Sequence, residues 1–230
     1  MGSVASISII LYFYLFDNLQ RWQRIVYLPI IILNVIMCMQ RSAWIVASIA
    51  LFGSLFHRFG NDRKSRLRIF GLLILFVSLI ATVWSFKNYL FTPTQLLYFE
   101  RRIGTVTLEN MFSSRNNQWN SAIEVFRNNP ITGFGLGSCG QKAAPFGMAV
   151  VTDGNHLRIL SEIGIFGFIA FCYVNIRGIY RALKRKEFYF ALAIVLYNIA
   201  AIGSPIFDQY YASFAYWLIL GCTSAIIRTE

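Results

Sequence analysis

Charged side chains are scarce in this sequence. They make up 13% of its 230 residues, against about 25% in typical soluble domains. Apolar residues account for 57% of the chain, and the mean hydropathy is +0.55. Such a chain has too little polar surface to cover a globule in water, so lipid must solvate much of it. The composition excludes a large soluble domain and predicts an integral membrane protein.

Cysteine and histidine are also few, and their spacing does not fit a metal site. The chain has four cysteines and two histidines, with no Cys-x-x-Cys pair and no His/Cys cluster. Cys38, Cys172 and Cys222 lie in apolar runs, where a thiol acts as a small hydrophobic group. We therefore expect no metal ligands in this chain.

Apolar runs are abundant and carry the predicted fold. We expect an all-α polytopic membrane protein with about seven transmembrane helices. Four spans are predicted within residues 1–86, a large outer loop over 87–156 with short amphipathic helices, and three spans within 157–230. The runs are 4–16, 25–39, 43–56, 69–86, 157–176, 188–204 and 212–227.

Basic residues are divided unevenly between the two sides of these spans. Thirteen of the 21 Lys and Arg residues fall in short loops on one side, and eight fall on the other. The positive-inside rule places the first side in the cytoplasm, so the 87–156 loop and the N-terminus lie outside. The net charge of +11 therefore reflects membrane orientation, and no nucleic-acid partner is expected.

Because an exported N-terminus at the very edge of a span is unusual, we expect this chain to be the C-terminal part of a longer protein.

The outer loop contains a helical pattern. Trp119, Ile123 and Phe126 recur at helical spacing, and Pro130 ends the run. This predicts an amphipathic helix at the outer interface, with a helix that merely covers the bundle as the alternative. Another short helix is expected over 94–103.

Alternating glycines follow that helix. Gly133, Gly135 and Gly137 lie in the segment 129–138, and backbone of this kind can present several N–H groups to an anion. A dinucleotide-binding loop would require a strand before these glycines, and no strand is predicted there. The two interpretations are a tight re-entry turn and a phosphate contact.

Arginines gather on the outer side. Arginine at membrane depth is costly and suggests function, and planar guanidinium groups bind phosphate oxygens through two hydrogen bonds at once. Several arginines converging on one cleft would bind a diphosphate. For Arg41 and Arg158 a structural partner, such as Asp208 or Glu162, is an equal alternative, and Arg127 suits an exposed helix face. The outer arginines are Arg41, Arg101, Arg102, Arg115, Arg127 and Arg158.

Asp153 and His156 stand at the start of the fifth predicted span. A carboxylate beside an imidazole can remove a proton from a hydroxyl nucleophile. The two residues are candidate catalytic bases. In the alternative interpretation Asp153 only caps the helix and His156 is an interfacial polar residue.

The order of these motifs resembles the O-antigen ligase and O-antigen polymerase superfamily. An arginine in a tight outer hairpin is followed by an Arg-x-x-x-Trp helix, then by an Asn-Pro-x-x-Gly-x-Gly turn, and then by a polar span start that leads into Gly-x-x-Gly. The segments are 40–44, 114–119, 129–137 and 153–167. The resemblance covers about residues 25–180. Members usually have ten or more spans, which agrees with a missing N-terminal part.

The resemblance implies a glycosyltransferase of the bacterial inner membrane whose active site faces the periplasm. Similar proteins move an oligosaccharide from undecaprenyl diphosphate to a hydroxyl group, without a cofactor. The acceptor is another lipid-linked repeat unit in polymerases and a lipid A core sugar in ligases. Membrane lipid and a chain-length regulator are further expected partners. By motif position Arg41 and Arg115 would bind the diphosphate, whereas Arg102 and Arg158 are added on local chemistry alone.

One departure from the family pattern favours a polymerase. Ligases usually have His-Asn at the start of the polar span, where this chain has Asp153-Gly154, with His156 three residues after Asp153. Polymerase-like members vary more here. A ligase, a non-enzymatic component of lipid-linked sugar transport or assembly, and an inactive remnant are the alternatives. A transport path would need charged residues along the middle of several spans, and this chain lacks that pattern.

Overall fold

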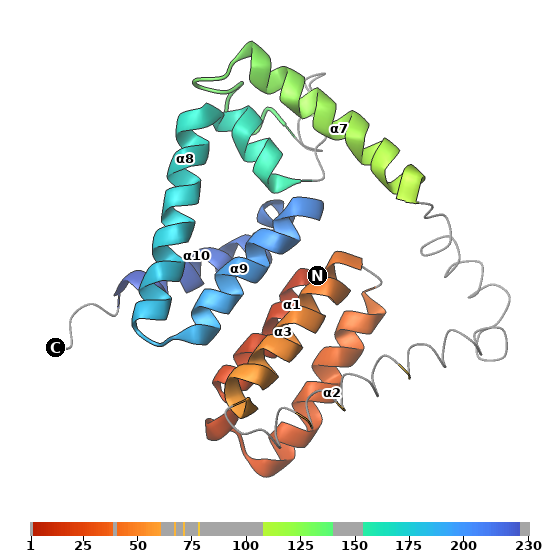
Figure 1. Cartoon of the computed structure of the whole chain (residues 1–230), viewed down its shortest axis with the longest axis vertical. Coiled ribbons are helices and arrows are strands. Elements are labelled where there is room, and N and C mark those ends of the chain that lie inside the picture. The colour runs from red at the N-terminus through yellow and green to blue at the C-terminus, as the bar shows by residue number, and fades with distance from the viewer. Residues whose placement is uncertain are drawn as a thin grey trace, which may run out of the picture. The chain divides into compact units, whose positions relative to one another are not determined.

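Figure 1 shows the computed structural model of the chain. It describes residues 2–38, 41–60, 108–139 and 154–225, with single positions at 67, 71 and 78. Every regular element in these residues is a helix, which confirms the all-α class. The elements are α1 (Gly2–Tyr14), η1 (Phe16–Asn18), α2 (Arg21–Met37), α3 (Arg41–Phe59), α7 (Leu108–Asn128), α8 (Asn155–Lys184), α9 (Phe188–Gly203), η3 (Ile206–Asp208) and α10 (Tyr210–Ala225).

The helices coincide with most of the predicted apolar runs. Six of the seven runs overlap a helix, and the other, 69–86, falls almost wholly outside the described residues. Within the described chain, α8 and the Ser42–Phe59 part of α3 are long and apolar enough to cross a membrane, whereas α9 is apolar but shorter. Large apolar side chains such as Phe166 and Ile176 are exposed along α8, as expected of a helix that faces lipid. The seven-span count and the outer position of the loop stay predictions.

The chain divides into two compact units. One consists of residues 1–51 and 115–230, and the other is Phe52–Ser114. In the second unit the described residues are mainly the C-terminal part of α3 and the first turns of α7. The described side chains that form the site below belong to the first unit.

α9 forms the centre of the first unit. It packs against α1, α8 and α10, and Ile194, Leu196 and Tyr197 on it are fully buried. Small residues allow neighbouring helices to approach closely. Four buried alanines serve this purpose on α9: Ala191, Ala193, Ala200 and Ala201.

α7 confirms the helix predicted from the spacing of Trp119, Ile123 and Phe126. It ends at Asn128, two residues before Pro130, because a proline disfavours helical geometry in the residue that precedes it. Ala122 on α7 is fully buried. The second short helix expected over 94–103 lies outside the described residues.

Candidate functional site

α8 is broken about a third of the way along its length, and the chain that follows α7 packs against the break. Gly164 has φ 68° and ψ −170°, which is not helical. A break of this kind leaves backbone carbonyl and amide groups without their helical partners. Residues 129–139, called the glycine turn below, supply the replacements. Phe134 N donates to Ser161 O, Gly135 N donates to Glu162 O, and Ile165 N donates to Pro130 O, each at 2.9 Å.

Two glycines make this contact sterically possible. A Cβ atom on Gly164 would stand 2.2 Å from the carbonyl oxygen of Ile131, and one on Gly133 would stand 2.4 Å from that of Glu162. Both glycines also have positive φ, a conformation that other residues rarely adopt. The Asn-Pro-x-x-Gly-x-Gly and Gly-x-x-Gly segments are therefore two halves of one joint.

The backbone of the glycine turn is largely committed to this joint. Besides the bonds to α8, Gly133 N donates to Asn129 O and Ser138 N donates to Gly135 O, while Cys139 N donates to Glu162 Oε1. These N–H groups have protein acceptors already. The geometry supports the tight re-entry turn, and the phosphate contact stays a prediction.

Glu162 ties the glycine turn to α8 from inside the joint. Its side chain is buried and accepts from Arg158 Nε at 2.7 Å and from Cys139 N at 3.1 Å. A buried carboxylate is tolerated only when it is paired in this way. The structure thus contains the Arg158–Glu162 pair that was the alternative for Arg158. Binding of a diphosphate by Arg158 stays a prediction.

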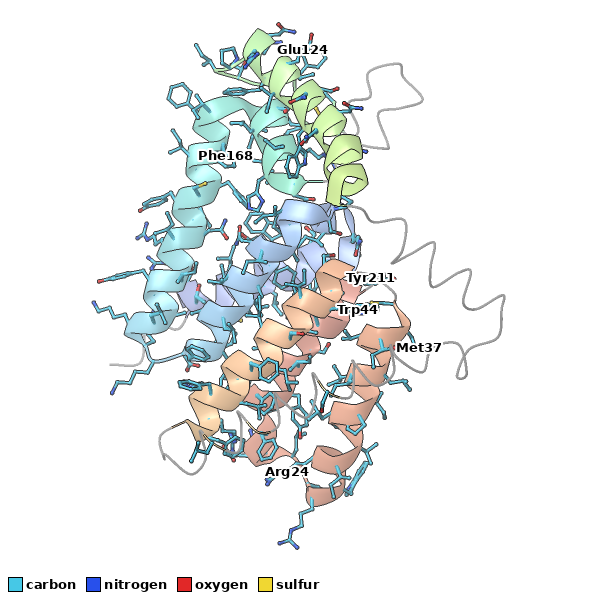
Figure 2. The ribbon with its side chains drawn as sticks, turned by 45° about the vertical axis from the view of Figure 1, so that its right-hand side comes forward. Arg24, Met37, Trp44, Glu124, Phe168 and Tyr211 are labelled. Atoms are coloured by element: carbon cyan, nitrogen blue, oxygen red, sulfur yellow. The ribbon has the colours of Figure 1, made fainter. Side chains whose placement is uncertain are left out.

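Ser161 joins α8 to α7. Its hydroxyl lies 2.9 Å from Ala122 O and 2.8 Å from Leu157 O, and the residue is 1% exposed. This contact could not be predicted from the sequence, because a serine inside a span can also bond only to its own helix. In Figure 2 the label Glu124 marks α7, and the label Phe168 marks the stretch of α8 that follows the break.

Cys139, at the end of the glycine turn, should react slowly with thiol reagents. Burial raises the pKa of its thiol above the ordinary value, and only the thiolate is nucleophilic. In solubilised protein with Cys139 as the sole cysteine, we expect maleimide labelling at neutral pH at least about tenfold slower than in a cysteine-free protein carrying Leu136→Cys. Leu136 is 85% exposed in the same turn. Equal rates would contradict the buried position of Cys139.

His156 begins a chain of polar side chains that crosses the bundle. Its Nε2 lies 3.2 Å from Asn198 Oδ1 on α9. Asn198 Nδ2 donates to Asn175 Oδ1 on α8 at 2.6 Å, and the Tyr216 hydroxyl on α10 donates to the same oxygen. Asparagines within apolar runs are a recognisable signal, because polar groups in membrane spans are costly. Sequence reasoning nevertheless missed Asn175, Asn198 and Tyr216.

The predicted catalytic pair is described only in part. α8 begins at Asn155, and its N-cap residue is Gly154, without a side-chain cap. The alternative interpretation, in which Asp153 caps this helix, is therefore wrong by one residue, because Gly154 takes the N-cap position with an extended backbone. Asp153 itself lies outside the described residues, so its place beside His156 stays a prediction.

The predicted diphosphate arginines are likewise described in part. Arg41 is the first residue of α3 and Arg115 lies within α7, but their side chains are outside what the structure describes, as is the side chain of Asp208. Arg102 lies wholly outside the described residues. Only Arg158 has a described side chain. Convergence of the four arginines on one cleft stays a prediction.

A groove elsewhere on the first unit does not belong to this site. Its volume is about 400 Å³, and it lies between the C-terminal parts of α8 and α10. Arg177, Arg181 and Trp217 line it, and Arg181 Nη1 donates to Ser224 Oγ. These arginines belong to the dense basic set that the positive-inside rule assigns to the cytoplasmic side.

Comparison with known proteins identifies the family of the site. Residues 26–172 match the family model described as O-antigen ligase. The match runs from α2 into the second half of α8 and includes the glycine turn, Glu162 and Gly164. Asn198 and Tyr216 lie beyond it. No curated protein and no solved structure matches the chain.

Proposed function

This chain belongs to the O-antigen ligase family, and we propose that it polymerises oligosaccharide repeat units carried on undecaprenyl diphosphate into surface polysaccharide. The family match supports a membrane glycosyltransferase of the ligase or polymerase type in the bacterial envelope. The observation that carries the proposal is this match over residues 26–172, which contains all six residues proposed below. In the proposal, the reaction takes place at the periplasmic face of the inner membrane.

Arginines bind the leaving group in this proposal. Arg41 and Arg115 stand at the motif positions, and Arg102 and Arg158 are added from local chemistry. When the bond from the anomeric carbon to the diphosphate oxygen breaks, negative charge grows on the diphosphate. Guanidinium groups fixed around it stabilise that charge in the transition state.

A base activates the acceptor. The acceptor hydroxyl oxygen attacks the anomeric carbon, its proton passes to the base, and the lipid diphosphate leaves with the electron pair of the broken bond. Asp153 and His156 are the proposed bases. The reaction needs no metal or other cofactor in this scheme, because a lipid diphosphate is already a good leaving group.

The polymerase is proposed ahead of the ligase because of Asp153-Gly154, since ligases of the family that this chain resembles usually have His-Asn at that place. The ligase remains the second candidate, because the matched family model bears that description. In it the acceptor is a sugar of the lipid A core.

Gel profiles of surface polysaccharide from a deletion strain separate the two candidates. We expect loss of the chain-length ladder with a single repeat unit still attached to the lipid A core, and recovery when the full-length gene is restored. A bare core with lipid-linked polymer accumulating would show a ligase instead. An unchanged profile would overturn both.

A further inference from the structure

Unpartnered polar atoms gather at the N-terminus of α8. Five buried side-chain atoms have no hydrogen-bond partner among the described residues, and three of them are Trp119 Nε1, Asn155 Oδ1 and His156 Nδ1. Trp119 Nε1 lies 3.8 Å from where a Cβ atom on Gly154 would stand, so all three atoms belong to this helix end. Asn155 is only 2% exposed. A buried polar atom without a partner is destabilising, which indicates that something else completes these bonds.

The chain of side chains behind His156 decides which of its nitrogens carries the proton. Asn175 Nδ2 donates to Phe171 O, so Asn175 Oδ1 is the acceptor for its neighbours. Asn198 Nδ2 donates to that oxygen and to Ile194 O, which leaves Asn198 Oδ1 facing His156. An amide oxygen can only accept. His156 Nε2 must therefore donate, and in the neutral ring Nδ1 is left with a lone pair.

The chemistry of the three atoms selects the group that would bind them. Asn155 Oδ1 and His156 Nδ1 are acceptors in this arrangement, and Trp119 Nε1 is a donor. Two buried acceptors at one helix end repel a phosphate oxygen but suit hydroxyl groups, which donate to each acceptor and accept from the indole. A sugar, which carries several hydroxyls, matches this set.

We propose that Trp119 Nε1, Asn155 Oδ1 and His156 Nδ1 form a binding site for hydroxyl groups of the acceptor sugar, and that Asn198 is a positioning residue that holds neutral His156 in the tautomer with a lone pair on Nδ1. This assignment rests on the proposed function, because it names the acceptor site of the same reaction. It places hydroxyl recognition at the start of α8 and leaves the diphosphate to the arginines.

The proton position on His156 can be measured without enzymatic activity. The chain has two histidines, so His57→Gln makes His156 the only one. With ¹⁵N-labelled imidazole in this 230-residue chain in lipid nanodiscs, recorded at alkaline pH so that the spectrum is that of the neutral ring, we expect the tautomer with a protonated Nε2 and an unprotonated Nδ1. Asn198→Leu removes the acceptor, so both tautomers should appear. A neutral ring protonated at Nδ1 in the His57→Gln protein, or an unchanged spectrum in Asn198→Leu, would overturn the role of Asn198.

Two lipid probes test what the site binds. Lipid-linked repeat unit extracted from the strain that carries the gene should shift the His156 Nδ1 and Trp119 Nε1 resonances, and undecaprenyl diphosphate without sugar should not. Asn155→Leu should raise the lipid concentration at the midpoint of the first titration about tenfold, which is the effect of losing one buried hydrogen bond. Asn34→Leu is the matched control, because Asn34 is an exposed asparagine on α2 and should leave the midpoint unchanged.

The outcomes separate this site from the proposed function. Equal shifts with both lipids, or no effect of Asn155→Leu, would overturn the hydroxyl site even if the protein elongates polysaccharide. Sugar-specific shifts with a normal polysaccharide ladder in the deletion strain would uphold the site and overturn the polymerase.

Discussion

Gly164→Ala is expected to disrupt the joint between the glycine turn and α8 and to abolish the polysaccharide ladder. The added Cβ atom would stand 2.2 Å from Ile131 O and 2.5 Å from the carbon of the same carbonyl. Both are backbone atoms, so no side chain can move aside. The φ and ψ of Gly164 also lie in a region that is essentially restricted to glycine. Complementation of a deletion strain and thermal unfolding of the purified protein measure the effect.

Two other glycines separate this clash from the cost of a positive φ. Gly133 and Gly137 have similar φ, 71° and 80°, but a Cβ atom on Gly137 would meet nothing within 4 Å. Both alanine variants pay about 1–2 kcal/mol for the left-handed conformation. Only Gly133→Ala adds a backbone clash, with Glu162, so its melting temperature should fall well below that of Gly137→Ala. Equal melting temperatures would show that the joint does not form as described.

Arg41→Lys and Arg115→Lys should each abolish long-chain polysaccharide while the protein still inserts in the membrane. Lysine keeps the charge but loses the planar fork that binds two phosphate oxygens together. Removal of one such contact from a transition state typically lowers the rate about 100-fold to 1000-fold. The measurement is the polysaccharide ladder in complemented deletion cells, with protein level in the membrane fraction followed alongside.

Arg127→Lys is the matched control for Arg115→Lys. Arg127 lies on the same helix, in its last turn, and is exposed. Because no diphosphate role is proposed for it, the ladder should be normal. A normal ladder in Arg41→Lys and Arg115→Lys as well would remove the basis for diphosphate binding by these residues.

Local sequence signals predicted the helices well. Pro130 after a run with helical spacing placed the end of α7 within two residues of where it occurs, because the effect of proline acts on its immediate neighbour. The Arg158–Glu162 pair was also predicted, as the alternative role of Arg158, and it too depends on local spacing. Residues four apart on a helix face each other whatever the rest of the fold does, and the two atoms lie 2.7 Å apart.

Contacts between distant segments could not be predicted from the sequence. Asn198 meets His156 from 42 positions away, and Ser161 meets Ala122 from 39. No local pattern records which polar residue of one span faces which residue of another. The glycines of the turn were recognised as a motif, yet their purpose was left between a turn and an anion site, because a glycine is equally suited to both.

The sequence by itself determined the membrane class, most of the helical segments and the family, since composition, periodicity and motif order can be read without coordinates. Only the tertiary structure decided that the two glycine motifs close on each other, that Glu162 is buried beneath them, and that His156 is held by Asn198. These features arise where the path of α7, the glycine turn and α9 brings separate backbones within hydrogen-bond distance of α8. Hydrogen bonds form over about 3 Å, so their partners are set by packing and not by position along the chain.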